Sequence, residues 1–356
     1  MSLDKTLCSS CIDTLCVAYP FLTGATPKPI KLSENHTFCF TSPEGKLWIL
    51  RITPDDHRNS EEIKAELTFM SILTRENSNL NICDAIRNEH GDLFVSVTPY
   101  EDGKKWWAAV FNFAKGSSDG FDVLANYEAV EEWGRCTGRM HKISSKYGCD
   151  SANTDSEEWK QILSAVPNWD QTHFGALSPS RIEELGKLSD KGAEVAADWK
   201  GLLERLNSIP KTSNSFGVVH GDLNLSNFFV EKGEQLRLWL FDFDQIQTNY
   251  FGCDIAVAIT GARFLYKFGW AGKPLNFDIS KYEESFLRGY ESEYQKVDRD
   301  ELDIFVDWRE LYNTSISLDI LDKIANNKEE FDESISSFVK LLVDRYPSRN
   351  HKGIRD

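Results

Sequence analysis

The feature that most constrains the fold is a pair of apolar runs near the middle of the chain. Phe228–Val230 and Leu236–Phe241 flank a polar segment with a glycine, residues 231–234. Two such runs around such a turn predict a β-hairpin. Asn227 precedes the first strand and Asp242 follows the second. Because a hairpin closes at its turn, these two residues are expected to meet at its open end.

The polar residues around this hairpin suit phosphoryl transfer. An amide oxygen from Asn227 and a carboxylate from Asp242 can share one small hard cation, as Mg²⁺ requires. Asp222 lies just upstream, where it could place a second carboxylate beside that ion. The metal would neutralise phosphate charge, and this carboxylate would accept the proton of an attacking hydroxyl. The alternative is an ordinary hairpin with incidental carboxylates, since one short motif matches many unrelated sequences.

The same residues carry a resemblance to kinases. His220-x-Asp222 with Asn227 fits the H-x-D-x-x-x-x-N spacing of kinase catalytic loops. Asp242-Phe243 resembles the start of the metal-binding DFG motif.

Two departures separate this stretch from eukaryotic protein kinases, because Gly221 replaces their usual Arg and Asp244 replaces the Gly of DFG. The segments HGDLNLSNFF, FDFDQ and CDIA together are similar to the aminoglycoside phosphotransferase and choline kinase-like family. The resemblance covers most of the chain and implies an α+β, two-lobed protein-kinase-like fold. It implies a nucleotide-binding lobe with an antiparallel sheet over residues 1–98, a hinge over 99–103, and a mainly helical catalytic and acceptor-binding lobe over 104–356.

The family resemblance also implies roles for single residues. Asp222 would be the catalytic base, and Asn227 and Asp242 would hold Mg²⁺. His220 would brace the catalytic loop, and Asp254 of the CDIA segment would anchor that loop from the next helix.

Other residues correspond to the family's nucleotide site. The loop around Asn35 corresponds to the nucleotide-covering loop, although it lacks glycines; its backbone amides could still hold phosphate. Arg51, on a predicted strand, would bind the phosphates, and Glu66 would pair with it from a helix. Asn59 and Glu62 stand at capping-box spacing and mark the start of that helix. The alternative for this pair is two ordinary surface charges.

The resemblance places adenine against the Pro99 carbonyl and the Glu101 amide, after a predicted strand at 94–98. Neither contact requires a particular side chain, so the residue types indicate little here.

Further patterns predict helices at 7–19, 122–144, 181–206, 255–268 and 301–313, strands at 38–40 and 47–50, and an irregular segment at 145–177.

The helix predicted at 301–313 has an acidic face. Asp303, Asp307 and Glu310 recur at i, i+4 and i+7. The family's C-terminal helices wall the acceptor cleft, so this face could bind ammonium groups. The alternative is a solvated face, which charge runs usually are.

Composition narrows the classes of partner. A formal net charge of −16 disfavours nucleic acid and would attract a cationic substrate, although many proteins are acidic simply for solubility. No apolar run approaches the ~20 residues that span a bilayer, and the N-terminus lacks the layout of a secretory signal. These features predict a cytoplasmic protein without membrane partners. The eight scattered cysteines favour reduced thiols, and Cys8-x-x-Cys11 lacks a second pair for zinc.

The sequence therefore predicts an ATP- and Mg²⁺-dependent phosphotransferase, with GTP as a possible co-substrate. Its acceptor would be a hydroxyl on a small molecule such as an aminoglycoside, an amino alcohol or a sugar-like alcohol. The alternatives are a bacterial-type Ser/Thr protein kinase on the same fold and a non-catalytic nucleotide-binding pseudokinase. The acceptor and the oligomeric state cannot be read from the residues.

Overall fold

The computed structural model describes residues 6–42, 44–77, 79–100, 102–149, 154–168, 179–270, 273–326 and 333–344. The chain forms two compact units, each assembled from separate stretches. Unit 1 comprises Met1–Asp119, Asp150–Val166 and Ser226–Asp244, and unit 2 comprises Gly120–Cys149, Pro167–Leu225 and Gln245–Asp356. The continuous lobes expected from the sequence stay a prediction.

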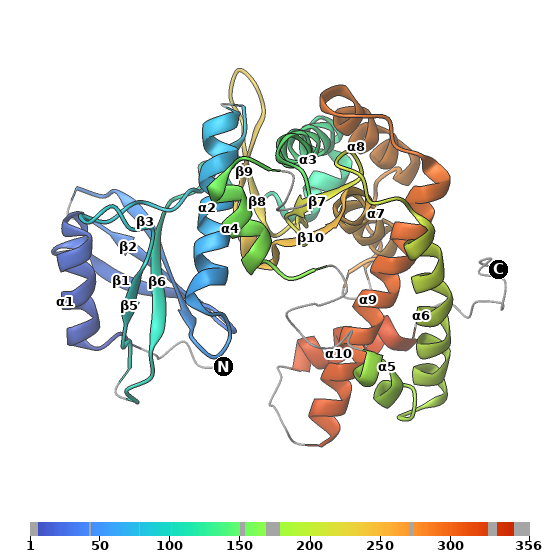
Figure 1. The fold of residues 1–356 in the computed structure, drawn as a ribbon, viewed down its shortest axis with the longest axis horizontal. Coiled ribbons are helices and arrows are strands. Elements are labelled where there is room, and N and C mark those ends of the chain that lie inside the picture. The colour runs from blue at the N-terminus through green and yellow to red at the C-terminus, as the bar shows by residue number, and fades with distance from the viewer. Residues whose placement is uncertain are drawn as a thin grey trace. The chain divides into compact units, whose positions relative to one another are not determined.

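Unit 1 holds most of the strands (Figure 1). Its elements are α1 (Ser9–Ala18), β1 (Thr26–Leu32), β2 (His36–Thr41), β3 (Leu47–Pro54), α2 (Ser60–Glu76), β4 (Asn81–Ile82), β5 (Val95–Val97), β6 (Trp106–Asn112), α4 (Glu157–Ala165), β8 (Phe228–Glu231) and β9 (Arg237–Leu240).

The main sheet of unit 1 has the strand order β1-β2-β3-β6-β5, and every neighbouring pair in it is antiparallel. Alternate residues such as Phe38 and Phe40, or Leu50 and Ile52, are buried, as the period of two in a half-buried sheet requires. The α1 residues Cys11 and Leu15 join the same core cluster. This confirms the antiparallel N-terminal sheet predicted from the sequence. A second sheet, β4-β9-β8, contains the predicted hairpin.

Several predicted segments need correction. β1 lies in a stretch for which no strand was predicted, and its prolines are tolerated because it is an edge strand. α4 lies inside the segment predicted to be irregular; Ser156 caps it, and Trp159 and Ile162 are buried. One helix was expected over 181–206, but α5 and α6 divide at Ser189, whose side chain caps α6.

Unit 2 is mainly helical (Figure 1). Its elements are α3 (Tyr127–Tyr147), α5 (Pro179–Leu185), α6 (Asp190–Ser208), β7 (Phe216–Val219), β10 (Gln247–Tyr250), α7 (Phe251–Phe268), α8 (Ile279–Glu293), α9 (Arg299–Ala325) and α10 (Glu333–Asp344). In the stretches that the structure describes, no helix is long and apolar enough to cross a bilayer.

The predicted catalytic loop of unit 2 begins at the end of a paired strand. β7 pairs antiparallel with β10, so His220 follows directly from a paired strand.

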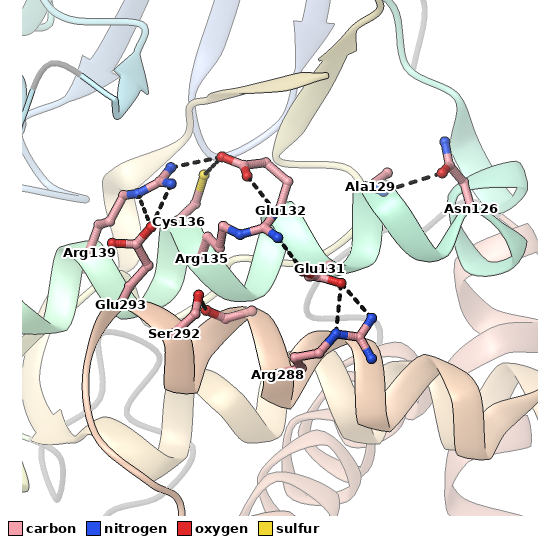
Figure 2. A network of polar contacts seen from close by, with 11 residues as sticks. Asn126, Ala129, Glu131, Glu132, Arg135, Cys136, Arg139, Arg288, Ser292 and Glu293 are labelled. Carbon is pink, nitrogen blue, oxygen red and sulfur yellow. Dashed lines mark hydrogen bonds and ion pairs between the residues drawn. The ribbon is translucent and has the colours of Figure 1, made fainter. Parts of the chain in front are cut away.

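α3 and α8 pack closely, and Figure 2 shows the polar contacts that join them. The Arg139 guanidinium contacts Glu132 of its own helix over 2.8 Å and Glu293 of α8 over 2.7 Å.

Candidate active site

The hairpin predicted from the sequence is present in unit 1. β8 and β9 pair antiparallel along their length. Beyond the strands, the backbone N–H of Phe241 donates to the Asn227 carbonyl over 3.0 Å. Asn227 and the residue after Phe241, Asp242, therefore stand at the open end of the hairpin.

The backbone of Asp242 is strained. Its φ is 65°, and within the described ranges it is the only residue other than glycine with a positive φ. Such conformations cost free energy and cluster at functional sites. Asn227 is buried at 7% exposure. An amide oxygen and a carboxylate at one hairpin end fit a hard divalent cation, so the residues present suit Mg²⁺. Their roles as metal ligands stay a prediction.

The predicted ion pair on the nucleotide side is formed within unit 1. Nη2 of Arg51 on β3 lies 2.7 Å from Oε2 of Glu66 on α2, and both residues are buried. Burial acts to lower the pKa of Arg51, but the carboxylates of Glu66, Asp244 and Asp242 together raise it above its ordinary value. The predicted capping box of Asn59 and Glu62 begins α2 and so fixes the position of Glu66. The contact of Arg51 with phosphate stays a prediction.

A second cation shares this carboxylate, and sequence reasoning missed it. Nη1 of Arg58 donates to Oε2 of Glu66 over 2.9 Å, and Arg58 is 2% exposed. No pattern marks Arg58, because a lone Arg just before a helix usually lies in solvent. The Glu66 carboxylate is therefore held by two guanidinium groups.

The side chain of Asn35 is turned into unit 1. Its Oδ1 accepts from the Thr53 hydroxyl over 2.7 Å, and its Nδ2 donates to Asp244 over 2.9 Å. Burial and the neighbouring Asp242 charge raise the pKa of Asp244, while Arg51 acts to lower it. A nucleotide contact from this turn would accordingly come from its backbone amides. The nucleotide-binding role of Asn35 stays a prediction.

The segment predicted to contact adenine is tied to the N-terminal helix. The Pro99 carbonyl accepts from the Cys8 backbone N–H over 2.9 Å, and the Cys8 thiol donates to the Thr98 carbonyl over 3.1 Å. Glu101 lies outside the described residues. The adenine contacts stay a prediction. The hydrogen bonds from Cys8, the N-cap residue of α1, to this segment were not indicated by the sequence.

In unit 2, Asp254 near the start of α7 organises the predicted catalytic loop. Its carboxylate accepts from the backbone N–H groups of His220 and Gly221 over 2.9 and 2.8 Å. It also contacts Nε2 of His141 over 3.2 Å. Burial acts to raise the pKa of Asp254, but His141 and these donors lower it below its ordinary value. Asp254 is 2% exposed, so it is a buried and fully engaged carboxylate.

The conformation of the catalytic loop explains Gly221. Its φ is 81°, and a Cβ there would overlap the backbone carbonyl of Gln245. An Arg, as in eukaryotic protein kinases, would not fit this backbone.

Asp222, the predicted base, is held by two side chains of unit 2. Its Oδ1 accepts from Nη2 of Arg309 over 2.6 Å, and its Oδ2 accepts from Nδ2 of Asn224 over 2.8 Å. Its side chain keeps 29% exposure, so it can still be reached from solvent. The role of Asp222 as base stays a prediction. Arg309 was missed, because no local sequence pattern links it to Asp222.

The acidic residues of α9 do not share one solvated face. Asp307 is buried at 5% exposure and accepts from Arg205 of α6 over 3.0 Å. Asp303 is largely exposed and lies 3.8 Å from Arg263. The i, i+4, i+7 spacing was read correctly, but the packing of α6 on α9 covers the middle of the stripe. A role in acceptor binding stays a prediction for Asp303 and Glu310, and at Asp307 it would have to displace Arg205.

Comparison with known proteins identifies the class. The model of the phosphotransferase enzyme family matches residues 27–305. Amicoumacin kinase of Bacillus subtilis (strain 168) is 23% identical over 264 residues, which are 74% of this chain and 69% of that protein. The chain belongs to the phosphotransferase enzyme family and is an enzyme, a small-molecule phosphotransferase.

Solved structures agree on the fold. Amicoumacin kinase hAmiN, in complex with AMP-PNP, Ca²⁺ and Ami, matches with a TM-score of 0.71 at 18% identity, over 94% of this chain and 91% of that one. A microcompartment-associated aminopropanol kinase matches with a TM-score of 0.65 at 19% identity, over 94% and 95%. The prediction of an α+β, protein-kinase-like fold is confirmed.

Proposed function

We propose that this enzyme transfers the γ-phosphoryl group of ATP to a hydroxyl of a small molecule that carries an amine, with Mg²⁺ as the metal. The observation that carries the proposal is the hairpin end at which the chain brings together Asn227 and a strained Asp242. A small-molecule phosphotransferase needs an oxygen-donor site for a divalent ion.

The nucleotide part of the proposal rests on unit 1. Asn227 and Asp242 would hold Mg²⁺. When bound, Mg²⁺ would neutralise part of the phosphate charge. Arg51, kept charged and oriented by Glu66, would bind the phosphates. The likeness to a kinase solved with AMP-PNP and Ca²⁺ supports the use of a nucleoside triphosphate and a divalent ion. An ATP-dependent reaction also fits a cytoplasmic location, which is part of this proposal.

The acceptor part rests on unit 2. Asp222 would accept a hydrogen bond from the acceptor hydroxyl and take its proton as the hydroxyl oxygen bonds to the γ-phosphorus. The bond from that phosphorus to the β–γ bridging oxygen breaks, and ADP leaves. Asp254 holds the loop that carries Asp222 by its backbone amides. That Asp222 shares one ion's surroundings with Asn227 and Asp242 stays a prediction.

Two observations favour an amine-bearing acceptor. One structural relative is named an aminopropanol kinase, and its substrate is an amino alcohol. The formal net charge of −16 would draw a cation toward this protein.

The test is a phosphorylation screen of the purified protein. ATP or GTP with Mg²⁺ would be incubated with 1-amino-2-propanol, ethanolamine, choline, spectinomycin and amicoumacin, each in turn. We expect ADP release and a mass gain of one phosphoryl group on at least one amine. Transfer to none of these, but to a protein such as casein included in parallel, would favour a protein kinase. Nucleotide binding without any transfer would favour a non-catalytic module.

A further inference from the structure

Arg309 of α9 contacts the predicted base directly. Its Nη2 lies 2.6 Å from Oδ1 of Asp222, and its Nη1 donates to the Gly221 carbonyl over 3.2 Å. One guanidinium therefore reaches the side chain of Asp222 and the backbone just before it. Such a fork fixes a side-chain rotation relative to its own loop, which a single point charge would not do.

Arg309 is itself held in place. Its guanidinium carbon lies 5.0 Å from the centre of the Tyr312 ring, within the range of a cation–π contact. The side chain is 12% exposed, and the neighbouring Trp308 is 2% exposed. The donor is thus part of a packed helix surface.

Two side chains orient the carboxylate of Asp222 from opposite oxygens. Each carboxylate oxygen accepts one described hydrogen bond, from Arg309 or from Asn224. These contacts orient the carboxylate, and its side chain keeps 29% exposure. An oriented carboxylate suits phosphoryl transfer, where catalysis is mainly positioning and electrostatics.

We propose that Arg309 is a positioning residue that fixes the rotamer of Asp222 for the acceptor hydroxyl. This inference rests on the proposed function. The competing interpretation is that Arg309 blocks Asp222 until an acceptor displaces it. The two differ in sign, because removing a positioning residue slows turnover whereas removing a block raises it.

The first experiment compares Arg309→Ala and Arg309→Lys with the wild type. ATP turnover would be measured with 1-amino-2-propanol and with water as acceptors. We expect kcat of the Ala variant to fall about 100-fold, the loss typical of a misplaced catalytic group, with KM for ATP unchanged. Arg309→Lys should recover part of the loss, and added methylguanidinium should rescue the Ala variant in a saturable way.

The matched control is Arg299→Ala on the same helix, where the side chain is 53% exposed and pairs with Glu291. It should keep the wild-type kcat and show no rescue. An Arg309→Ala variant with unchanged or increased kcat overturns the proposal. So does a loss of melting temperature without loss of kcat, which would mean that Arg309 is only structural.

The pair can also be tested without turnover. Melting temperatures of Arg309→Ala, Asp222→Asn and the double variant should be non-additive, because residues in contact couple. Additive shifts overturn the pair. Failure of the proposed function would give a different result. In that case the wild type would show no phosphoryl transfer, or its transfer would persist in Asp222→Asn. If the wild type showed no transfer but the melting temperatures were still non-additive, Arg309 would be a structural residue. That result would also overturn the positioning role.

Discussion

Strain and burial are concentrated on a few residues of the candidate site. Asp242 adopts a left-handed backbone, Gly221 adopts a conformation in which a Cβ would overlap Gln245, and Asp254 is buried with several donors. The left-handed backbone of Asp242 costs free energy that a purely structural loop could avoid. Two substitutions separate the chemistry of these residues from their effect on folding.

Asp242→Asn should remove the charge and keep the backbone. Asn tolerates the left-handed region better than most residues, so the fold should survive. We expect Mg²⁺-dependent ATP binding to weaken about 10- to 100-fold or more, since even a supporting partner of a metal site costs that much. Isothermal titration with and without Mg²⁺, alongside a melting curve, measures both effects. An unchanged Mg²⁺ dependence would remove Asp242 from the metal site.

Asp254→Asn should destabilise unit 2 in a pH-dependent way. In the folded protein the pKa of Asp254 lies below its ordinary value of 3.8. The ionised carboxylate therefore stabilises the fold at pH values above 3.8. This stabilisation is lost as the pH falls through the lowered pKa. We expect the variant to cost about 3 kcal/mol at neutral pH, and this cost to shrink below about pH 4. Urea unfolding at both pH values measures it, and a cost independent of pH would contradict the assignment.

At the scale of elements, α3 and α8 pack with their backbones close together. A Cβ at Gly134 of α3 would overlap the Phe286 carbonyl, and one at Gly289 of α8 would overlap the Glu131 carbonyl. The glycines let the two backbones approach, and ion pairs such as Arg288 with Glu131 lie at the edge of the contact (Figure 2). Partly exposed pairs contribute little, so the backbone approach should dominate the stability of this pair.

Gly134→Ala should therefore cost about 3 kcal/mol, through overpacking against backbone that cannot move aside. Gly261→Ala in α7 is the matched control, because a Cβ there has open space. It should stabilise by up to about 1 kcal/mol through helix propensity. Denaturant unfolding of both variants measures the difference. Equal effects would mean that α3 and α8 are not in such close contact.

At the scale of the whole molecule, the net negative charge should act differently on a cationic acceptor and on anionic ATP. A cationic acceptor is attracted at long range by a protein of net charge −16, and salt screens that attraction. For 1-amino-2-propanol we expect kcat/KM to fall as NaCl rises from about 20 to 200 mM. Over the same range of NaCl, the KM for ATP, which is an anion, should not rise. If the acceptor kcat/KM is insensitive to salt, steering by net charge is excluded.

Sequence reasoning reached the features that are local in the chain. The hairpin follows from two apolar runs around a turn, and the start of α2 follows from its capping box. The Arg51–Glu66 pair, by contrast, was implied by the family resemblance. Contacts between distant segments were not predictable, since nothing local in the sequence couples Asn35 to Asp244 or Arg309 to Asp222. These contacts depend on how whole elements pack in each unit, which periodicity does not specify (Figure 1).

The most direct test of phosphoryl transfer through Asp222 is a single-turnover measurement on Asp222→Asn. Transfer from ATP to an accepted amino alcohol would be followed by rapid quench, with Mg²⁺–ATP affinity measured on the same protein. We predict that the transfer rate falls by roughly 10² to 10⁴, the range for loss of a general base, while Mg²⁺–ATP binds as in the wild type. Transfer at the wild-type rate, or an equal loss of nucleotide binding, would contradict the role of Asp222 as catalytic base.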